Sequence, residues 1–151
     1  MAKKPRSIRE AAMDYLSRRE HATQELFQKL QAKGYESEDI SLALNRLSEQ
    51  NLLSDERFTE AFVNQRMTKG SGPLKIRAEL RQKGISDAMI GTFLNEQDSV
   101  WSESALEVRL RKYGAEPAVD LNEKAKQNRF LQSRGFLIEQ ILYALNHTDD
   151  D

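Results

Sequence analysis

Three stretches of the chain share one pattern around a glycine. LQAKGYESEDISLAL at 30–44 returns as LRQKGISDAMIGTFL at 80–94 and as LQSRGFLIEQILYAL at 131–145. Each copy has Leu four residues before the glycine, a base directly before it, a large apolar residue directly after it, then Ile and Leu six and ten residues on. The glycines are Gly34, Gly84 and Gly135, spaced by 50 and 51 residues. Such a period predicts a short array of similar units.

The repeated glycine marks the end of a helix. A glycine in the left-handed conformation commonly follows the last helical residue, and an apolar contact across it completes the cap. The pairs that would make this contact are Leu30 with Tyr35, Leu80 with Ile85, and Leu131 with Phe136. Because all three copies agree, we predict helix ends directly before the three glycines.

Each repeat is predicted to contain three helices. Serine and aspartate favour helix N-caps, and proline favours the first helical position, so these residues mark the helix starts. The first helices are expected at 8–19 after Ser7, at 55–68 after Ser54, and at 100–112 after Asp98 or Ser99. The middle helices begin near Thr23, at Pro73 and at Asp120, and the last helices span 37–50 after Ser37, 87–96 after Ser86, and 137–146. No run of alternating β-branched residues predicts a strand.

The expected fold is all-α, with three tandem three-helix repeats. Short helices bury little surface alone, so neighbouring repeats must share interfaces. We therefore expect an elongated, monomeric array, whose curvature the sequence leaves open. Its predicted parts are a frayed N-terminus at 1–8, repeats at 9–53, 54–97 and 98–146, and an acidic tail at 147–151.

Composition narrows the classes of function. The formal net charge is −1, so binding to DNA or to an anionic membrane would need a local cluster of cations. The chain has no Cys, which removes disulfides and thiolate sites, and no long apolar run typical of a signal peptide or a membrane span. The expectation is a soluble cytoplasmic protein.

The sequence offers no constellation of catalytic residues. His21 and His147 lie far apart and fit no metal-ligand spacing, and without Cys a structural zinc site is not expected. The stretch KGSGPLKIR at 69–77 departs from the phosphate-loop order, so a turn that leads into Pro73 is the simpler interpretation. We therefore expect a binding protein without cofactor or metal, rather than an enzyme.

Basic residues gather before each repeated glycine, chiefly in the second and third repeats. The candidate binding residues are Arg66, Lys69, Lys75, Arg77, Arg81, Lys83, Lys124, Lys126, Arg129 and Arg134. They form either an ordinary solvated face, with cations favoured near helix C-termini, or a basic stripe that faces phosphates or an acidic protein surface. The last helix of each repeat resembles a DNA-recognition helix in its position, but its acids disfavour entry into a groove. Tyr113, beside Arg111 and Lys112, is the aromatic side chain best placed to meet a base.

The residues of the second repeat also resemble a known family. The run LLSDERFTEAFVNQRMTKGSGPLKIRAELRQKGIS at 52–86 is similar to the signature of the bacterial RecX regulatory proteins. SRREHATQELFQKLQAKGY at 17–35, RKYG at 111–114 and KAKQNRFLQSRGF at 124–136 resemble the flanking parts of that family, so the resemblance extends over about residues 9–146. Six residues are expected to have structural roles: Gly34, Gly84, Gly135, and the D-E-R-F residues Asp55, Arg57 and Phe58.

The resemblance implies a modulator, usually an inhibitor, of the RecA recombinase in DNA repair and recombination. Members of the family bind in the groove of the RecA–DNA filament, where they depress ATP hydrolysis, strand exchange and the co-protease activity that triggers the SOS response. Some also bind DNA, so single- or double-stranded DNA is a weaker expected partner. Two alternatives stay open at this point: a DNA-binding module that acts without RecA, and a passive helical scaffold.

Overall fold

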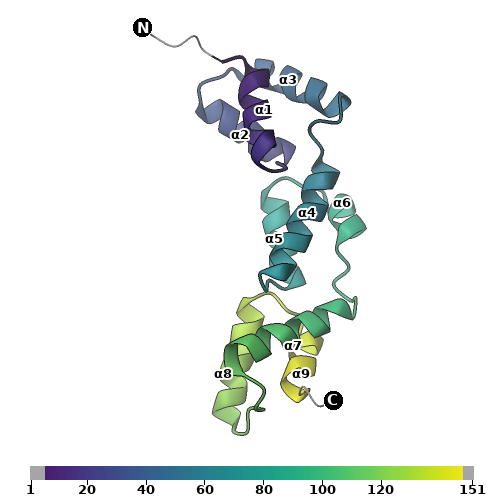
Figure 1. Ribbon diagram of the computed structural model, residues 1–151. Coiled ribbons are helices and arrows are strands. Elements are labelled where there is room, and N and C mark those ends of the chain that lie inside the picture. The colour runs from purple at the N-terminus through teal and green to yellow at the C-terminus, as the bar shows by residue number, and fades with distance from the viewer. Residues whose placement is uncertain (1–5, 148–151) are drawn as a thin grey trace. The chain divides into compact units, whose positions relative to one another are not determined.

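The computed structural model describes residues 6–147, and in that range the chain is helical with no strand (Figure 1). Its helices are α1 (Ile8–Arg18), α2 (Thr23–Ala32), α3 (Ser37–Glu49), α4 (Asp55–Thr68), α5 (Pro73–Gln82), α6 (Asp87–Phe93), α7 (Val100–Tyr113), α8 (Leu121–Ser133) and α9 (Ile138–Asn146). They follow one another as three sets of three, as the repeat predicts. The acidic part of the predicted tail and most of the predicted frayed end lie outside the described residues.

None of the described helices is both long enough and apolar enough to cross a lipid bilayer.

The three helix ends at the repeated glycines are confirmed. Gly34, Gly84 and Gly135 have φ angles of 98°, 81° and 96°. The amide after each glycine donates a hydrogen bond to the leucine carbonyl of the preceding turn: Tyr35 to Leu30 at 3.4 Å, Ile85 to Leu80 at 3.1 Å, and Phe136 to Leu131 at 3.3 Å. This bond defines the Schellman cap that the sequence pattern predicts.

Most predicted helix starts and N-caps are confirmed, and one predicted N-cap is wrong. The side chains of four predicted caps accept a hydrogen bond from the amide three residues on: Ser7, Ser54, Ser86 and Asp120. Ser37, predicted as the N-cap of the third helix, is instead the first residue of α3, and Glu36 occupies the cap position. The Ser37 hydroxyl oxygen instead accepts a hydrogen bond from Gln31 Nε2 on α2 at 3.1 Å. It therefore bonds to the preceding helix and not to a backbone amide in the first turn of α3.

The last helix of the second repeat is shorter than predicted. The helix expected over 87–96 is α6, which ends at Phe93. Beyond it, the Asn95 side chain accepts from the Gln97 amide at 3.0 Å, and the Asn95 carbonyl accepts from Trp101 Nε1 at 3.0 Å. Local side-chain bonds of this kind compete with the helical pattern and end it early.

By its internal contacts the chain divides into two compact units. The first unit contains residues 1–61 and 80–89, and the second contains residues 62–79 and 90–151. The division falls within α4, α5 and α6, so each unit includes part of the second repeat.

The core of the first unit comes from α1, α2 and α3, which pack on one another. Its fully buried side chains recur at helical spacing on each element, with Leu26 and Leu30 on α2 and Ile40 and Leu47 on α3. Burial of a side chain of this size stabilises the fold by about 1.5 to 3 kcal/mol. The packing of the three helices on one another therefore stabilises the first repeat.

In the second unit, α7 packs against both α8 and α9. Trp101, Leu131 and Phe136 are among its buried side chains. The Leu74 amide donates to the Gly135 carbonyl at 2.9 Å, which joins the start of α5 to the end of α8. A Cβ atom at Gly135 would lie 2.6 Å from the Lys75 backbone nitrogen. Glycine is therefore required at this position for two reasons, the positive φ angle and the close approach of the Lys75 backbone.

Candidate nucleic-acid and partner interface

Four of the ten predicted binding residues are engaged in ion pairs within the chain. These pairs are Arg66 with Glu79 at 3.2 Å, Arg81 with Asp87 at 2.8 Å, Lys83 with Glu25 at 2.9 Å, and Arg77 with Glu96. All four cations belong to the segment 66–83, where the sequence alone suggested a stripe of six bases. Lys69 and Lys75, the other two, are exposed and have no ion-pair partner within residues 6–147.

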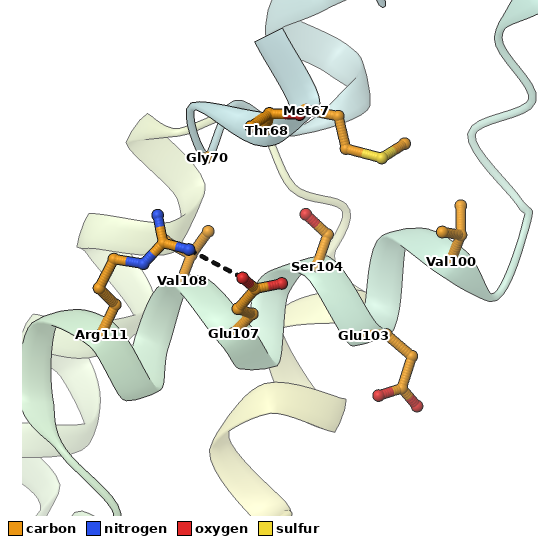
Figure 2. Close-up of a pocket in the computed structure, with 9 residues that line it drawn as sticks. All are labelled: Met67, Thr68, Gly70, Val100, Glu103, Ser104, Glu107, Val108 and Arg111. Atoms are coloured by element: carbon orange, nitrogen blue, oxygen red, sulfur yellow. Dashed lines mark hydrogen bonds and ion pairs between the residues drawn. The ribbon is translucent and has the colours of Figure 1, made fainter. Parts of the chain in front are cut away.

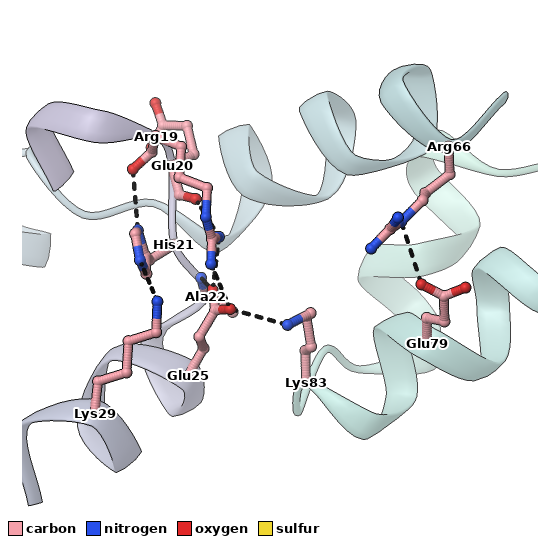
Figure 3. Close-up of polar contacts among 9 residues, drawn as sticks. All are labelled: Arg19, Glu20, His21, Ala22, Glu25, Lys29, Arg66, Glu79 and Lys83. Atoms are coloured by element: carbon pink, nitrogen blue, oxygen red, sulfur yellow. Dashed lines mark hydrogen bonds and ion pairs between the residues drawn. The ribbon is translucent and has the colours of Figure 1, made fainter. Parts of the chain in front are cut away.

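The Lys83 ammonium belongs to a partly exposed ionic network around the buried Glu25 carboxylate in the first unit (Figure 3). The Glu25 carboxylate, only 9% exposed, accepts from Lys83 Nζ at 2.9 Å and from Arg19 Nη1 and Nη2 at 3.1 and 2.9 Å. It also accepts from the Ala22 amide at 3.3 Å, which caps the start of α2. Burial opposes ionisation, but the hydrogen bonds from Arg19 and Lys83 outweigh it and lower the pKa of Glu25 to about 2. Lys83 thus has a stabilising role.

The Arg66 guanidinium is held on two sides. It lies 4.7 Å from the centre of the Phe62 ring. On its other side it forms an ion pair with Glu79, which Figure 3 shows. Its Nε atom is buried and makes no aligned hydrogen bond in the described part of the chain. Such a side chain is poorly placed to reach a partner.

The cations of the third repeat have a different environment. Lys124, Lys126 and Arg129 are exposed on α8 and form no ion pair with any described residue. A helix face with several unpaired cations attracts phosphates or carboxylates from outside the chain.

A second group of cations surrounds the Phe130 ring where three helices end. Lys112 Nζ lies 4.8 Å and Arg134 Cζ lies 5.1 Å from the ring centre. Lys69, at the end of α4, and Arg111, on the last turn of α7, line the same small cavity. We call Lys69, Arg111, Lys112 and Arg134 the basic cluster.

Most of the charge of the basic cluster is not neutralised within the chain. Arg111 pairs with Glu107 at 2.8 Å, one turn earlier on α7. Lys69, Lys112 and Arg134 have no carboxylate partner in the described range. The C-terminal ends of α7 and α8 supply partial negative charge that favours cations there, but each such end is equivalent to only about half an elementary charge. The cluster therefore remains positive.

Tyr113, expected as the aromatic most suited to a base, is packed inside this region. Its ring is partly buried and meets the Phe130 ring edge-on, with 5.6 Å between centres. The Phe130 ring in turn makes cation–π contacts with Lys112 and Arg134. The aromatic pair therefore positions cations, and its rings are not free platforms for stacking.

Asp55, Arg57 and Phe58 of the D-E-R-F run all make contacts inside the chain. Asp55 Oδ1 accepts from the Thr23 amide at 2.7 Å, and Arg57 Nε donates to Glu20 at 2.9 Å. Phe58 is 3% exposed. These contacts give each of the three residues a place in the folded structure and leave none of them as a free binding group.

One buried cation was not predicted from the sequence. Arg109 is fully buried on α7, where Nε donates to Gln127 at 2.9 Å and Nη2 donates to the Glu116 carbonyl at 2.8 Å. Its Nη1 atom has no hydrogen-bond partner among the described atoms. Helical spacing does carry a signal, because Arg109 lies four and eight residues after the buried Ala105 and Trp101.

Across residues 6–147, no group of three or more His, Asp or Glu side chains has a geometry that would hold a metal ion. His21 is buried, with Nδ1 3.0 Å from the Arg19 carbonyl and Nε2 3.0 Å from Lys29 Nζ. Burial lowers the pKa of His21, so its neutral form is favoured.

Comparison with known proteins gives this arrangement a context. Models of the RecX family match the chain in three parts, the first three-helix domain at 9–47, the second at 54–94 and the third at 102–145. The chain is 43% identical over 145 residues to the regulatory protein RecX of Vibrio campbellii, covering 96% of this chain and 94% of that one. It is 39% identical to the regulatory protein RecX of Halorhodospira halophila, covering 96% and 90%. A crystal structure of regulatory protein RecX matches with a TM-score of 0.80 and 25% identity, covering 93% of this chain and 72% of that one. The chain belongs to the RecX family of regulatory proteins.

Proposed function

We propose that the protein modulates the RecA recombinase, chiefly as an inhibitor. It binds in the groove of the RecA–DNA filament and depresses ATP hydrolysis, strand exchange and co-protease activity. The observation that carries the proposal is the similarity to regulatory proteins RecX along nearly the whole chain, at 43% identity in the Vibrio campbellii protein. In this role the protein acts in the cytoplasm as a monomer, binds without catalysing a reaction, and limits DNA repair, recombination and the SOS response.

Three helical repeats suit this role because they offer several separate contact surfaces on one chain. Weak contacts that are linked covalently reinforce one another, since the first contact raises the effective concentration for the next. Such a protein changes the filament only if it binds one filament state more tightly than another. Inhibition at ratios below one copy per RecA subunit would follow if binding at a few positions stops growth or subunit exchange.

The unpaired cations are the side chains that we propose for contact with the filament. Lys75 and the α8 residues Lys124, Lys126 and Arg129 are exposed, and within residues 6–147 they form no ion pair. Phosphates of the bound DNA or carboxylates of RecA would neutralise them. Arg77 is a weaker candidate for a filament contact than the sequence suggested, because its guanidinium already forms an ion pair with Glu96.

A second candidate function is direct DNA binding without RecA. The observation that favours it is the same set of unpaired cations, since a chain of net charge −1 gains DNA affinity only from local positive surface. Such binding weakens steeply as salt rises, roughly in proportion to the number of phosphates neutralised.

Binding of the labelled protein to preassembled RecA filaments on single-stranded DNA, and to the same DNA alone, separates the two functions. We expect tight binding to filaments and much weaker binding to bare DNA at physiological salt. Equal or tighter binding to bare DNA would favour the DNA-binding module and would contradict the proposal.

A triple charge reversal, Lys124→Glu with Lys126→Glu and Arg129→Glu, tests the surface itself. It should weaken filament binding by at least about tenfold while helicity stays unchanged, because three attractive contacts become repulsive. The matched control is Arg18→Glu, an exposed cation on α1 that does not belong to the proposed surface. Unchanged binding by the triple variant would rule out α8 as a contact.

A further inference from the structure

Two adjoining cavities run along one face of α7 in the second unit. The larger has a volume of about 300 Å³ and lies between α7 and the end of α4, where Met67 and Thr68 face Val100 and Ser104 (Figure 2). The smaller has a volume of about 120 Å³ and lies at the basic cluster, over Phe130. Gly70, Val108 and Arg111 line both cavities, so the two form one channel that we call the α7 groove.

The two ends of the α7 groove differ in chemistry. The larger cavity has apolar side chains from Met67, Val100 and Val108, and Val100 is 42% exposed. Four cations gather at the other end, and one carboxylate, Glu107, pairs with Arg111 there. The Glu103 side chain extends away from Met67 and Thr68 in Figure 2 and accepts a hydrogen bond from the Tyr143 hydroxyl. A ligand that fits both ends is apolar at one end and anionic at the other.

The size of the groove selects a short segment of chain. A volume of about 300 Å³ is at the lower end for pockets that hold small ligands or anchoring side chains. It accommodates one large apolar side chain and the backbone beside it. The smaller cavity accommodates a carboxylate or a phosphate, but not a nucleobase together with its sugar.

The charges along the groove favour a peptide over a nucleic acid. A single strand carries a phosphate on every nucleotide, so a strand along α7 would bring negative charge to Glu107 and the apolar section as well as to the cations. A stacking surface for bases is also absent from the described groove, because Phe130 is covered by Lys112 and Arg134. A peptide carries charge only where its side chains supply it.

We propose that the α7 groove is a docking site for a protein partner's peptide segment, in which an apolar side chain is followed by one or more carboxylates. The apolar side chain lies against Met67 and Val108, and the carboxylate meets the guanidinium and ammonium groups of the basic cluster. Arg111 presents a planar fork suited to a carboxylate. Its ion pair with Glu107 at 2.8 Å is between exposed side chains and contributes little, so it leaves the fork accessible to a ligand. The Ser104 hydroxyl supplies a hydrogen bond to the peptide backbone, and the Thr68 hydroxyl, which already donates to the Asn64 carbonyl at 2.9 Å, accepts one from a peptide amide.

The inference goes beyond modulation of RecA, and its test contains no RecA. The probe is the acetylated hexapeptide Leu-Leu-Gly-Asp-Glu-Asp, titrated into the isotope-labelled full chain and followed by the backbone amide signals in NMR spectra. We expect saturable shifts at Gly70, Ser104, Val108 and Arg111, with a Kd of about 1 mM or below, which is typical of a short linear segment and worth about 4 kcal/mol. The same peptide with Asn and Gln in place of its acids should bind at least about tenfold more weakly.

Two variants locate the site from its opposite ends. Lys112→Glu with Arg134→Glu reverses the charge of the basic cluster, and Ser104→Tyr fills the larger cavity; each should weaken peptide binding at least about tenfold. The matched control is Arg18→Glu with Arg46→Glu, which reverses two exposed cations of the first unit that do not line the groove and should leave binding unchanged.

Three outcomes would overturn the proposal. They are the absence of saturable shifts up to several times the expected Kd, shifts that lie outside the groove, and equal affinity for the neutral peptide. A thymidine hexanucleotide serves as the competing ligand. Stronger binding of that oligonucleotide at the same amides would assign the groove to nucleic acid instead.

Discussion

Neutralising Glu25 should destabilise the first unit by a pH-dependent amount. The carboxylate lies 2.9 Å from both Arg19 Nη2 and Lys83 Nζ, and its pKa is lowered from 4.5 to about 2. A depressed carboxylate pKa contributes stability above pH 4.5, and that contribution is lost as the pH falls from 4.5 towards 2. Each pKa unit corresponds to about 1.4 kcal/mol, which gives an upper value of about 3.5 kcal/mol at neutral pH.

Solvent reduces this value, because the Arg19 side chain is 48% exposed and its ion pair is partly screened. We therefore expect Glu25→Gln to lower the free energy of unfolding by about 2 kcal/mol at pH 7 and by about 1 kcal/mol at pH 3. The measurement is urea unfolding followed by circular dichroism across this pH range. Glu38→Gln, an exposed acid in the first turn of α3, is the matched control and should have a small effect at either pH.

A double-mutant cycle isolates the Lys83 contact. Lys83→Met alone should destabilise the protein, and the two substitutions together should cost about 1 kcal/mol less than their sum, because each removes the same interaction. A Glu25→Gln effect below about 0.5 kcal/mol at pH 7, or one that is equal at pH 7 and pH 3, would show that the ionised Glu25 does not stabilise the fold through Arg19 and Lys83.

Four further substitutions have expected outcomes. Gly34→Ala should destabilise by about 1 kcal/mol through backbone strain at φ 98°, whereas Gly135→Ala should cost markedly more because its Cβ would also meet Lys75; equal losses in urea unfolding would contradict this. His21→Leu should reduce the loss of stability as the pH falls below 6.5, because the lowered pKa of His21 favours the neutral form that the native state holds; an unchanged pH profile would contradict it. Arg109→Ala should cost about 3 kcal/mol by leaving a cavity and breaking two charged hydrogen bonds, and a loss below about 1 kcal/mol would be too small for that role.

The caps were predictable because they depend on local chemistry. Gly34, Gly84 and Gly135 each need a positive φ, and the residues around them provide the apolar contact within one turn. Pro73 begins α5 for a similarly local reason. Ser37 shows the limit of this reasoning, because its hydroxyl bonds to Gln31 of the preceding helix once the two helices pack.

The candidate site was only partly predictable. The sequence supplied the cations, but not which of them the fold would neutralise. Arg77 forms an ion pair with Glu96, nineteen residues away, and Lys83 forms one with Glu25, fifty-eight residues away. Both pairs therefore depend on tertiary packing. The basic cluster likewise needs the ends of α4, α7 and α8 to meet at Phe130, and no local pattern encodes that meeting.

The most direct test of the proposed function is the rate of ATP hydrolysis by preassembled RecA filaments on single-stranded DNA, with this protein added below one copy per RecA subunit. We predict inhibition at these ratios, and weaker inhibition by the variant with Lys124→Glu, Lys126→Glu and Arg129→Glu. An unchanged rate at excess protein would contradict the proposed function.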